Sequence, residues 1–104
     1  MSDVNLVRAA VFTLAKNLHL KPFKRITFKI DPFHHNAAEV RDTLFHLSSN
    51  RVRQTNVQCI VKTEVTKTPP SIELQLNDGK HMLIRAAHLT TLEILEVLSR
   101  LARE

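Results

Sequence analysis

The sequence predicts an α/β fold in which helices cover a mixed four-stranded sheet, in the order β-α-β-β-β-α after an extra N-terminal helix. Apolar residues at every second position indicate strands over 23–30 and 55–65 and a hairpin over 72–84. Apolar residues three and four apart indicate helices over 37–47 and 91–103. The first strand–helix–strand unit makes its two strands parallel, with a right-handed crossover.

Composition narrows the function classes. The 104 residues suit one domain with a modest core, and no apolar run of about 18 residues exists to cross a membrane. A net charge of +5 favours an anionic partner such as nucleic acid. The single cysteine excludes an internal disulfide, so nothing suggests secretion.

The first segment predicts an amphipathic helix with Ser2 as a plausible N-cap. Its apolar stripe is Val4, Val7, Val11, Leu14 and Leu18. The segment also carries basic residues, so two interpretations stay open. It is either an organelle-targeting helix or a helix packed on the domain or on a neighbour.

The first strand is predicted over Phe23–Ile30, with a basic face opposite its apolar one. Asn36 is expected to cap the following helix, with Glu39 three residues on as in a capping box. The buried stripe of that helix is Ala37, Val40, Leu44 and Leu47.

The second strand is predicted over 55–65, with an apolar face made of Val57, Cys59, Val61 and Val65. The stiff connector 66–70 then leads either to an adjacent hairpin or across the first strand. The residues alone leave that strand order open.

The hairpin is the best-determined local structure. A three-residue loop with left-handed Gly79 pairs Leu74 with Met82 and Ile72 with Ile84. A two-residue loop would place Ile72 opposite Arg85, which puts a charge on the apolar face.

The stretch Arg85–Glu93 joins the last strand to the last helix. Thr90 is predicted as the N-cap, in a reciprocal capping box with Glu93. The small Ala86 and Ala87 let the backbone run close to another group. The last helix, from Thr91 to about Arg103, presents an apolar face of Leu92, Leu95, Leu98 and Ile94 or Leu101.

No catalytic or metal site is indicated. Cys59 lies on the apolar side of a strand, as a buried small hydrophobe does. The adjacent His34 and His35 point apart, and no Cys or His spacing matches a zinc pattern. One glycine cannot make a glycine-rich phosphate loop. Stacking of RNA bases would require exposure of Phe23 or Phe33.

Basic residues are the remaining signal. Parallel strands begin at the same edge of a sheet, so Lys21, Lys24, Arg51 and Arg53, near the two strand starts, are expected to converge there. Basic side chains grouped in this way can bind phosphates. Arg85 and His88 reach that edge if the last strand runs antiparallel to the first. The alternative is a solvated basic rim. The candidate nucleic-acid contacts are Lys21, Lys24, Arg25, Arg51, Arg53, Arg85 and His88.

A family resemblance covers Leu18 to Ala102 of the chain. It is carried by Leu20-Lys21-Pro22, Asp31-Pro32-Phe33, Arg51-Val52-Arg53-Gln54-Thr55-Asn56 with Cys59, Asn77-Asp78-Gly79, and above all the stretch from Arg85 to Glu93. In these motifs the chain resembles the family of the mitochondrial large-subunit ribosomal protein number fifty-three.

The resemblance implies a thioredoxin-like domain over 20–104, after an N-terminal amphipathic helix over 1–19. It also implies strand order two-one-three-four. At 31–36, where redox relatives carry a cysteine pair, this sequence has none.

The implied function is a non-catalytic structural constituent of the mitochondrial large ribosomal subunit. Such a protein works in the matrix near the stalk base, contacting rRNA and stalk-base proteins. No cofactor, metal, membrane or small-molecule substrate is implied. The alternative is a thioredoxin-like structural subunit of another mitochondrial complex, held by protein contacts through the first helix.

Overall fold

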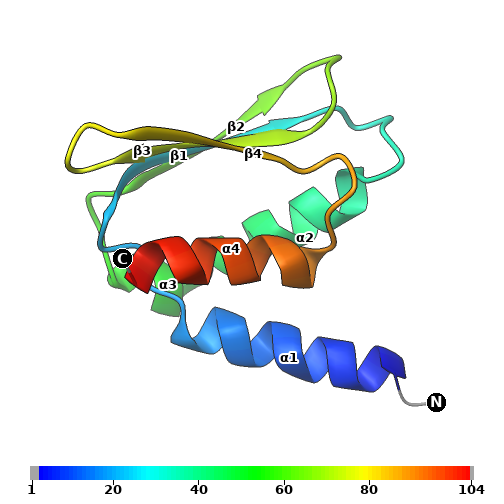
Figure 1. Ribbon diagram of the computed structural model, residues 1–104, viewed down its shortest axis with the longest axis horizontal. Helices are drawn as coiled ribbons and strands as arrows, with labels where there is room; N and C mark the ends of the chain where they lie inside the picture. Colours follow the sequence, from blue (N-terminus) through cyan, green and yellow to red (C-terminus); the bar gives the residue numbers. More distant parts are fainter. Residues whose placement is uncertain (1–2, 104) are drawn as a thin grey trace.

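The computed structural model describes residues 3–103 and has the predicted α/β architecture with one additional short helix (Figure 1). The elements in chain order are α1 (Asp3–Asn17), β1 (Phe23–Ile30), α2 (Ala37–Leu47), α3 (Asn50–Gln54), β2 (Ile60–Val65), β3 (Ser71–Leu76), β4 (His81–Arg85) and α4 (Thr91–Arg103). Ser2, the predicted cap of α1, lies outside the described residues. None of the helices described is long and apolar enough to cross a membrane.

The sheet has the order β2-β1-β3-β4, as the resemblance implied, and the arrangement is thioredoxin-like. β1 and β2 are parallel, whereas β3 is antiparallel to both β1 and β4. The hairpin register is confirmed, since Leu74 pairs with Met82 and Ile72 with Ile84. Gly79 has φ of +91°, the left-handed conformation that glycine adopts without strain.

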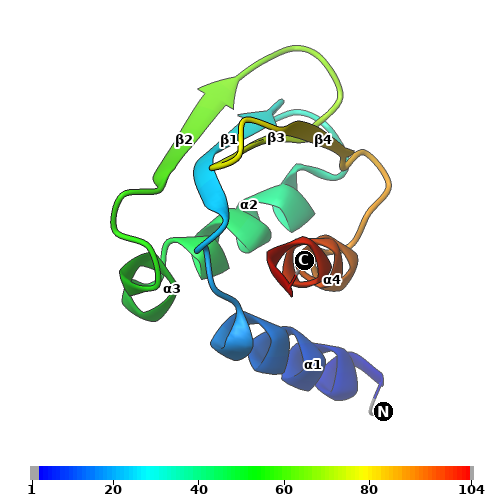
Figure 2. The ribbon, with the colours of Figure 1, turned by 60° about the vertical axis from the view of Figure 1, so that its left-hand side comes forward.

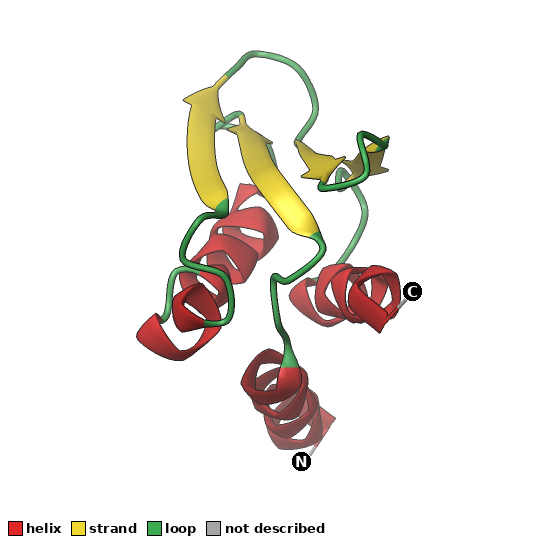
Figure 3. Ribbon diagram, turned by 90° about the vertical axis from the view of Figure 1, so that its left-hand side faces the viewer, coloured by secondary structure: helices red, strands yellow, loops and turns green. Residues whose placement is uncertain are grey.

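All the helices of residues 3–103 lie on one side of the sheet, and none of them covers its other face, which we call the open face (Figures 1 and 3). The alternation of β1 explains this arrangement. Ile26 and Phe28 are fully buried against the helices, and Ile30 is nearly so. Arg25 and Lys29 point to the open face, on which the exposed Ile60 and Leu83 also lie.

A β-bulge interrupts the alternation at the start of β1. The pairing with β3 shifts between Phe23 and Arg25, which leaves Lys24 as the extra residue. Strict alternation would put Phe23 on the open face beside Arg25, but the bulge turns it inward, where it is fully buried. Base stacking on Phe23 is thereby excluded.

The predicted start of the second strand was wrong. Residues 50–54 form the short helix α3, capped by Ser49, whose side chain accepts a hydrogen bond from the Val52 N–H. The strand begins only at Ile60. Of its predicted apolar face, Cys59 is buried, but Val57 and Val65 are each 76% exposed.

The two terminal helices complete the core. Ile94, Leu95 and Leu98 of α4 are fully buried, and α1 packs chiefly against α4 beneath them (Figure 2). Val11 and Ala15 bring α1 into the same apolar cluster. This packing supports the docked interpretation of α1 and leaves the targeting interpretation untested.

Candidate nucleic-acid interface

The loop that leads into β1 is fixed by side chains from distant parts of the chain. The Asn56 amide donates to the carbonyls of Leu20 and Phe23, at 3.0 Å each. The Asn77 amide donates to the Lys21 carbonyl at 2.9 Å, and the Leu20 N–H donates to the Thr55 hydroxyl at 2.9 Å. The exposed Lys21 and Lys24 side chains therefore start from an ordered backbone.

A polar groove of about 510 Å³ lies over this loop. Its lining residues are Lys21, Phe23, Lys24, Thr55, Asn56, Gln58 and Asn77. The Asn56 and Asn77 amides in this lining already donate to backbone carbonyls. The positive charge that the groove offers to an anion comes from its two lysines. Sequence reasoning missed the anchoring role of Thr55, Asn56 and Asn77. Asn77 was read only as a turn residue, and no local pattern distinguishes the two roles.

Arg51 and Arg53 lie on α3 and not at the start of a strand. α3 sits at the same end of the sheet as the beginning of β1, so the predicted proximity of these arginines to Lys21 and Lys24 holds at the level of the fold (Figure 2). Arg51 is exposed and Arg53 half-buried, and neither lines the polar groove. The four cations are thus grouped at one end of the sheet without forming one pocket. We call these four residues the basic end.

Arg85 and His88 lie at the opposite end of the sheet. β4 is parallel to β1 because both are antiparallel to β3. The condition under which these residues would reach the basic end is therefore not met, and their assignment to that end was wrong. Arg85 pairs with Ser71, which pairs with Lys29 on β1. Lys29 is six positions from Phe23, so about 20 Å separates the two ends at roughly 3.3 Å per residue.

Arg25 lies between the two ends, on the open face of the sheet. Its neighbours there are Ile60 on β2 and Gln75 on β3. Further along the same face Lys29 forms an ion pair with Glu73, with 2.7 Å between Nζ and Oε1. The hydrogen bond and the charge of Glu73 raise the pKa of Lys29, so this lysine stays charged at neutral pH. The open face thus connects the basic end to Arg85.

Asn36 organises the end of the sheet where Arg85 lies. Its side chain makes no cap bond to α2, contrary to the prediction. Its amide instead donates to the carbonyls of Ala86, at 2.6 Å, and Leu89, at 2.8 Å. Ala86 is fully buried. The close approach that the small alanine permits is therefore to Asn36 of the same chain.

Aromatic rings gather beside this loop. The rings of His34 and His35 stack with centroids 4.2 Å apart, so the expectation that they point apart was wrong. The His88 ring lies 5.9 Å from that of His35. Phe33 is 96% exposed, which leaves its face free to stack a base.

Cys59 behaves as a buried small hydrophobe, as predicted. It is 2% exposed. Burial raises the pKa of its thiol, and the opposing effect of the nearby Arg53 charge is smaller. A raised pKa leaves little thiolate at neutral pH. Within residues 3–103, no three histidine, cysteine or carboxylate side chains are grouped closely enough to hold a metal ion.

A comparison with known protein families gives a match. The model of the family described as 39S ribosomal protein L53/MRP-L53 matches residues 30–79. The matched region runs from the last residue of β1 through α2, α3, β2 and β3 to the hairpin glycine. This match supports membership of the mitochondrial large-subunit L53 family and confirms the family resemblance noted in the sequence.

Proposed function

We propose that this chain, of the mitochondrial large-subunit ribosomal L53 family, is a non-catalytic constituent of that subunit that holds rRNA and protein neighbours together near the stalk base. The family match carries the proposal. It implies a structural role in the mitochondrial ribosome, and we extend that role to rRNA contact, the stalk base and the matrix. We also propose that residues 20–104 form the domain proper and 1–19 an attached helix.

The distribution of charge supports rRNA contact. Lys21, Lys24 and Arg51 are exposed at one end of the sheet, and Arg85 and His88 are exposed at the other. Arg25 lies between them on the open face, which none of the described helices covers. RNA helices are recognised mainly through phosphates and ribose hydroxyls, and exposed basic side chains such as these suit the phosphates. We propose that an RNA backbone runs along this face from one end to the other.

Sedimentation of mitochondrial extracts tests the proposed function. A tagged full-length chain is expected to migrate with the large ribosomal subunit and to leave it when the subunit is dissociated by high salt. Migration with a different mitochondrial assembly would instead support the alternative, a structural subunit held by protein contacts. The exposure of Leu6, at 68%, and Phe12, at 64%, on α1 is the observation that favours this second candidate.

A further inference from the structure

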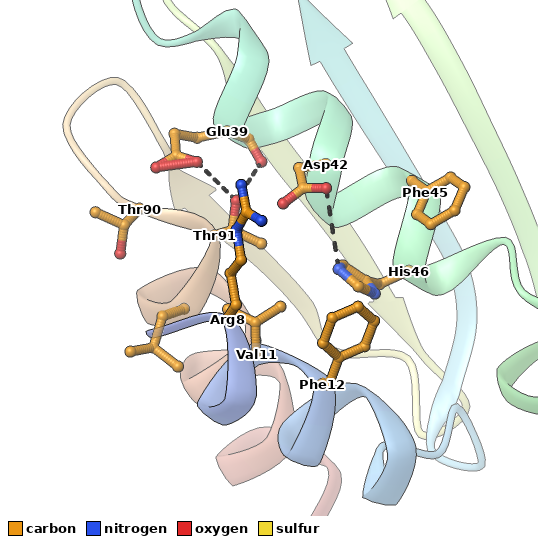
Figure 4. Close-up of a pocket in the computed structure, with 10 residues that line it drawn as sticks. Arg8, Val11, Phe12, Glu39, Asp42, Phe45, His46, Thr90 and Thr91 are labelled. Atoms are coloured by element: carbon orange, nitrogen blue, oxygen red, sulfur yellow. Dashed lines mark hydrogen bonds and ion pairs between the residues drawn. The ribbon is translucent and has the colours of Figure 1, made fainter. Parts of the chain in front are cut away.

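A groove separates α1 from α2 on the helical side of the molecule, away from the open sheet face (Figure 4). Its volume is about 520 Å³. Arg8, Val11 and Phe12, at helical spacings of three and four, line it from α1. The start of α4 contributes Thr91 and Leu92. Because α1 packs chiefly on α4, the side of α2 that faces α1 stays uncovered.

The rim of the groove is an ordered row of rings. Phe12 of α1 is 64% exposed and Phe45 of α2 is 71% exposed. His46 lies between them, with ring centroids 5.7 Å from Phe12 and 5.6 Å from Phe45, both in edge-to-face geometry. Two large apolar rings are thus exposed at the surface and packed against His46, as in an anchor site for a protein partner.

The polar groups that line the groove are two carboxylates, two threonine hydroxyls, Arg8 and His46. Glu39 is engaged internally, since its carboxylate accepts the Thr91 hydroxyl at 2.8 Å. Arg8 points from α1 into the groove toward α2 (Figure 4). Asp42 has a side chain 53% exposed and lies 3.9 Å from the His46 Nε2. A half-exposed carboxylate beside two phenylalanines disfavours phosphate and suits an apolar segment that carries a cation.

The shape of the groove indicates a helix as its occupant. Two helical faces border it, and a third helix packs between two others through residues three and four apart. We infer that the groove binds an amphipathic helix of a neighbouring protein, whose apolar residues cover Phe12 and Phe45 and whose lysine or arginine pairs with Asp42. The inference deepens the proposed function, on which it rests only for naming that neighbour a large-subunit protein.

Site-specific photo-cross-linking in the full-length chain tests the inference. Phe45 is replaced by p-benzoyl-phenylalanine, and in a second variant Phe12 is replaced, so that one probe remains if the other fails to accumulate. The mitochondrial fraction in which the chain sediments is irradiated. The expected product is a nuclease-resistant adduct, and its cross-linked peptide has apolar residues three and four apart and a lysine or arginine between them.

Matched controls locate the contact. The same probe at Phe33, which is also exposed but lies at the end of β1, is expected not to capture that peptide. Asp42→Lys is expected to lower the yield of the Phe45 adduct about 10-fold, because it sets like charges against each other. Asp78→Lys, in the exposed hairpin turn, is expected to leave the yield unchanged.

The inference is overturned by a nuclease-sensitive adduct, by an adduct to a second copy of the chain or to a peptide without that pattern, or by no adduct from either probe. The sedimentation of the chain tests the proposed function and is scored independently of the adduct. The expected adduct in a fraction other than the large subunit would overturn the proposed function and leave the groove assignment standing.

Discussion

The Asn36 side-chain amide donates to the Ala86 carbonyl at 2.6 Å, across 50 positions of the chain. The same amide also donates to the Leu89 carbonyl, so one side chain ties the loop after β1 to the loop before α4. Ala86 is held from its other side as well, since its N–H donates to the Pro70 carbonyl at 3.0 Å. The position of Arg85 and His88 therefore depends on a polar contact inside the domain.

Replacing this amide should destabilise the domain. Asn36→Ala leaves two carbonyls in a partly buried site without their donor, and we expect the free energy of unfolding to fall by about 1–3 kcal/mol. Urea denaturation followed by circular dichroism measures the change. The exposed Asn50→Ala serves as the control. Equal midpoints for the two variants would mean that the contact contributes nothing to stability.

The capping box of α4 makes a second prediction about stability. The Thr90 N–H donates to Glu93 Oε1 at 3.0 Å, and the Glu93 N–H donates to the Thr90 hydroxyl at 3.2 Å. Thr90→Ala should cost roughly 1 kcal/mol of stability. The two bonds form one reciprocal unit, so the double variant Thr90→Ala plus Glu93→Ala should cost less than the sum of the single variants. Strict additivity in thermal unfolding would contradict a coupled cap.

The arginines of α3 should contribute to RNA affinity through phosphate contacts. For the double variant Arg51→Ala plus Arg53→Ala, binding to a mitochondrial large-subunit rRNA transcript should weaken. The slope of log K against log salt should become shallower by about 2, roughly one per cation. The exposed helical pair Arg41→Ala plus Arg100→Ala is the matched control and should leave both quantities unchanged. An unaltered affinity in the α3 variant would remove both residues from the interface.

The opposite end of the sheet should act independently. Arg85→Ala plus His88→Ala is expected to weaken the same RNA further. Its effect should add to that of the α3 variant, because the two sites lie about 20 Å apart and would contact different phosphates of the RNA. Filter binding of the fourfold variant measures the sum. His88→Ala with full affinity and normal incorporation into the subunit would count against a role for that residue.

Cys59 should resist alkylation in the native protein. Burial raises the pKa of its thiol, so iodoacetamide is expected to react slowly at pH 8 and rapidly once urea unfolds the chain. Folding favours the protonated thiol, so this part of the stability is complete below the thiol's unfolded pKa. It is lost as the pH rises through the folded value. In Cys59→Ala that alkaline loss should disappear, and ready alkylation of the native thiol would revive a catalytic role.

Much of the fold could be predicted from the sequence because it depends on local chemistry. The alternation of Ile26, Phe28 and Ile30 identified β1 and its buried face. The single glycine fixed the hairpin register, since only one loop length puts Gly79 at positive φ and keeps the apolar pairs together. The cap of α4 likewise depends on residues close together in the sequence, Thr90 and Glu93.

The tertiary structure decided what depends on partners far along the chain. Asn36 and Asn56 look like ordinary cap and loop residues, yet each bonds to backbone more than 30 positions away. The separation of Arg85 from the basic end follows from the direction of β4, which no local pattern encodes. Local residue patterns thus determined the helices and strands and most of their buried faces, because the spacing of apolar residues along the chain sets which side of an element is buried. The grouping of the charges required the order and direction of the strands, which only packing of the whole sheet defines.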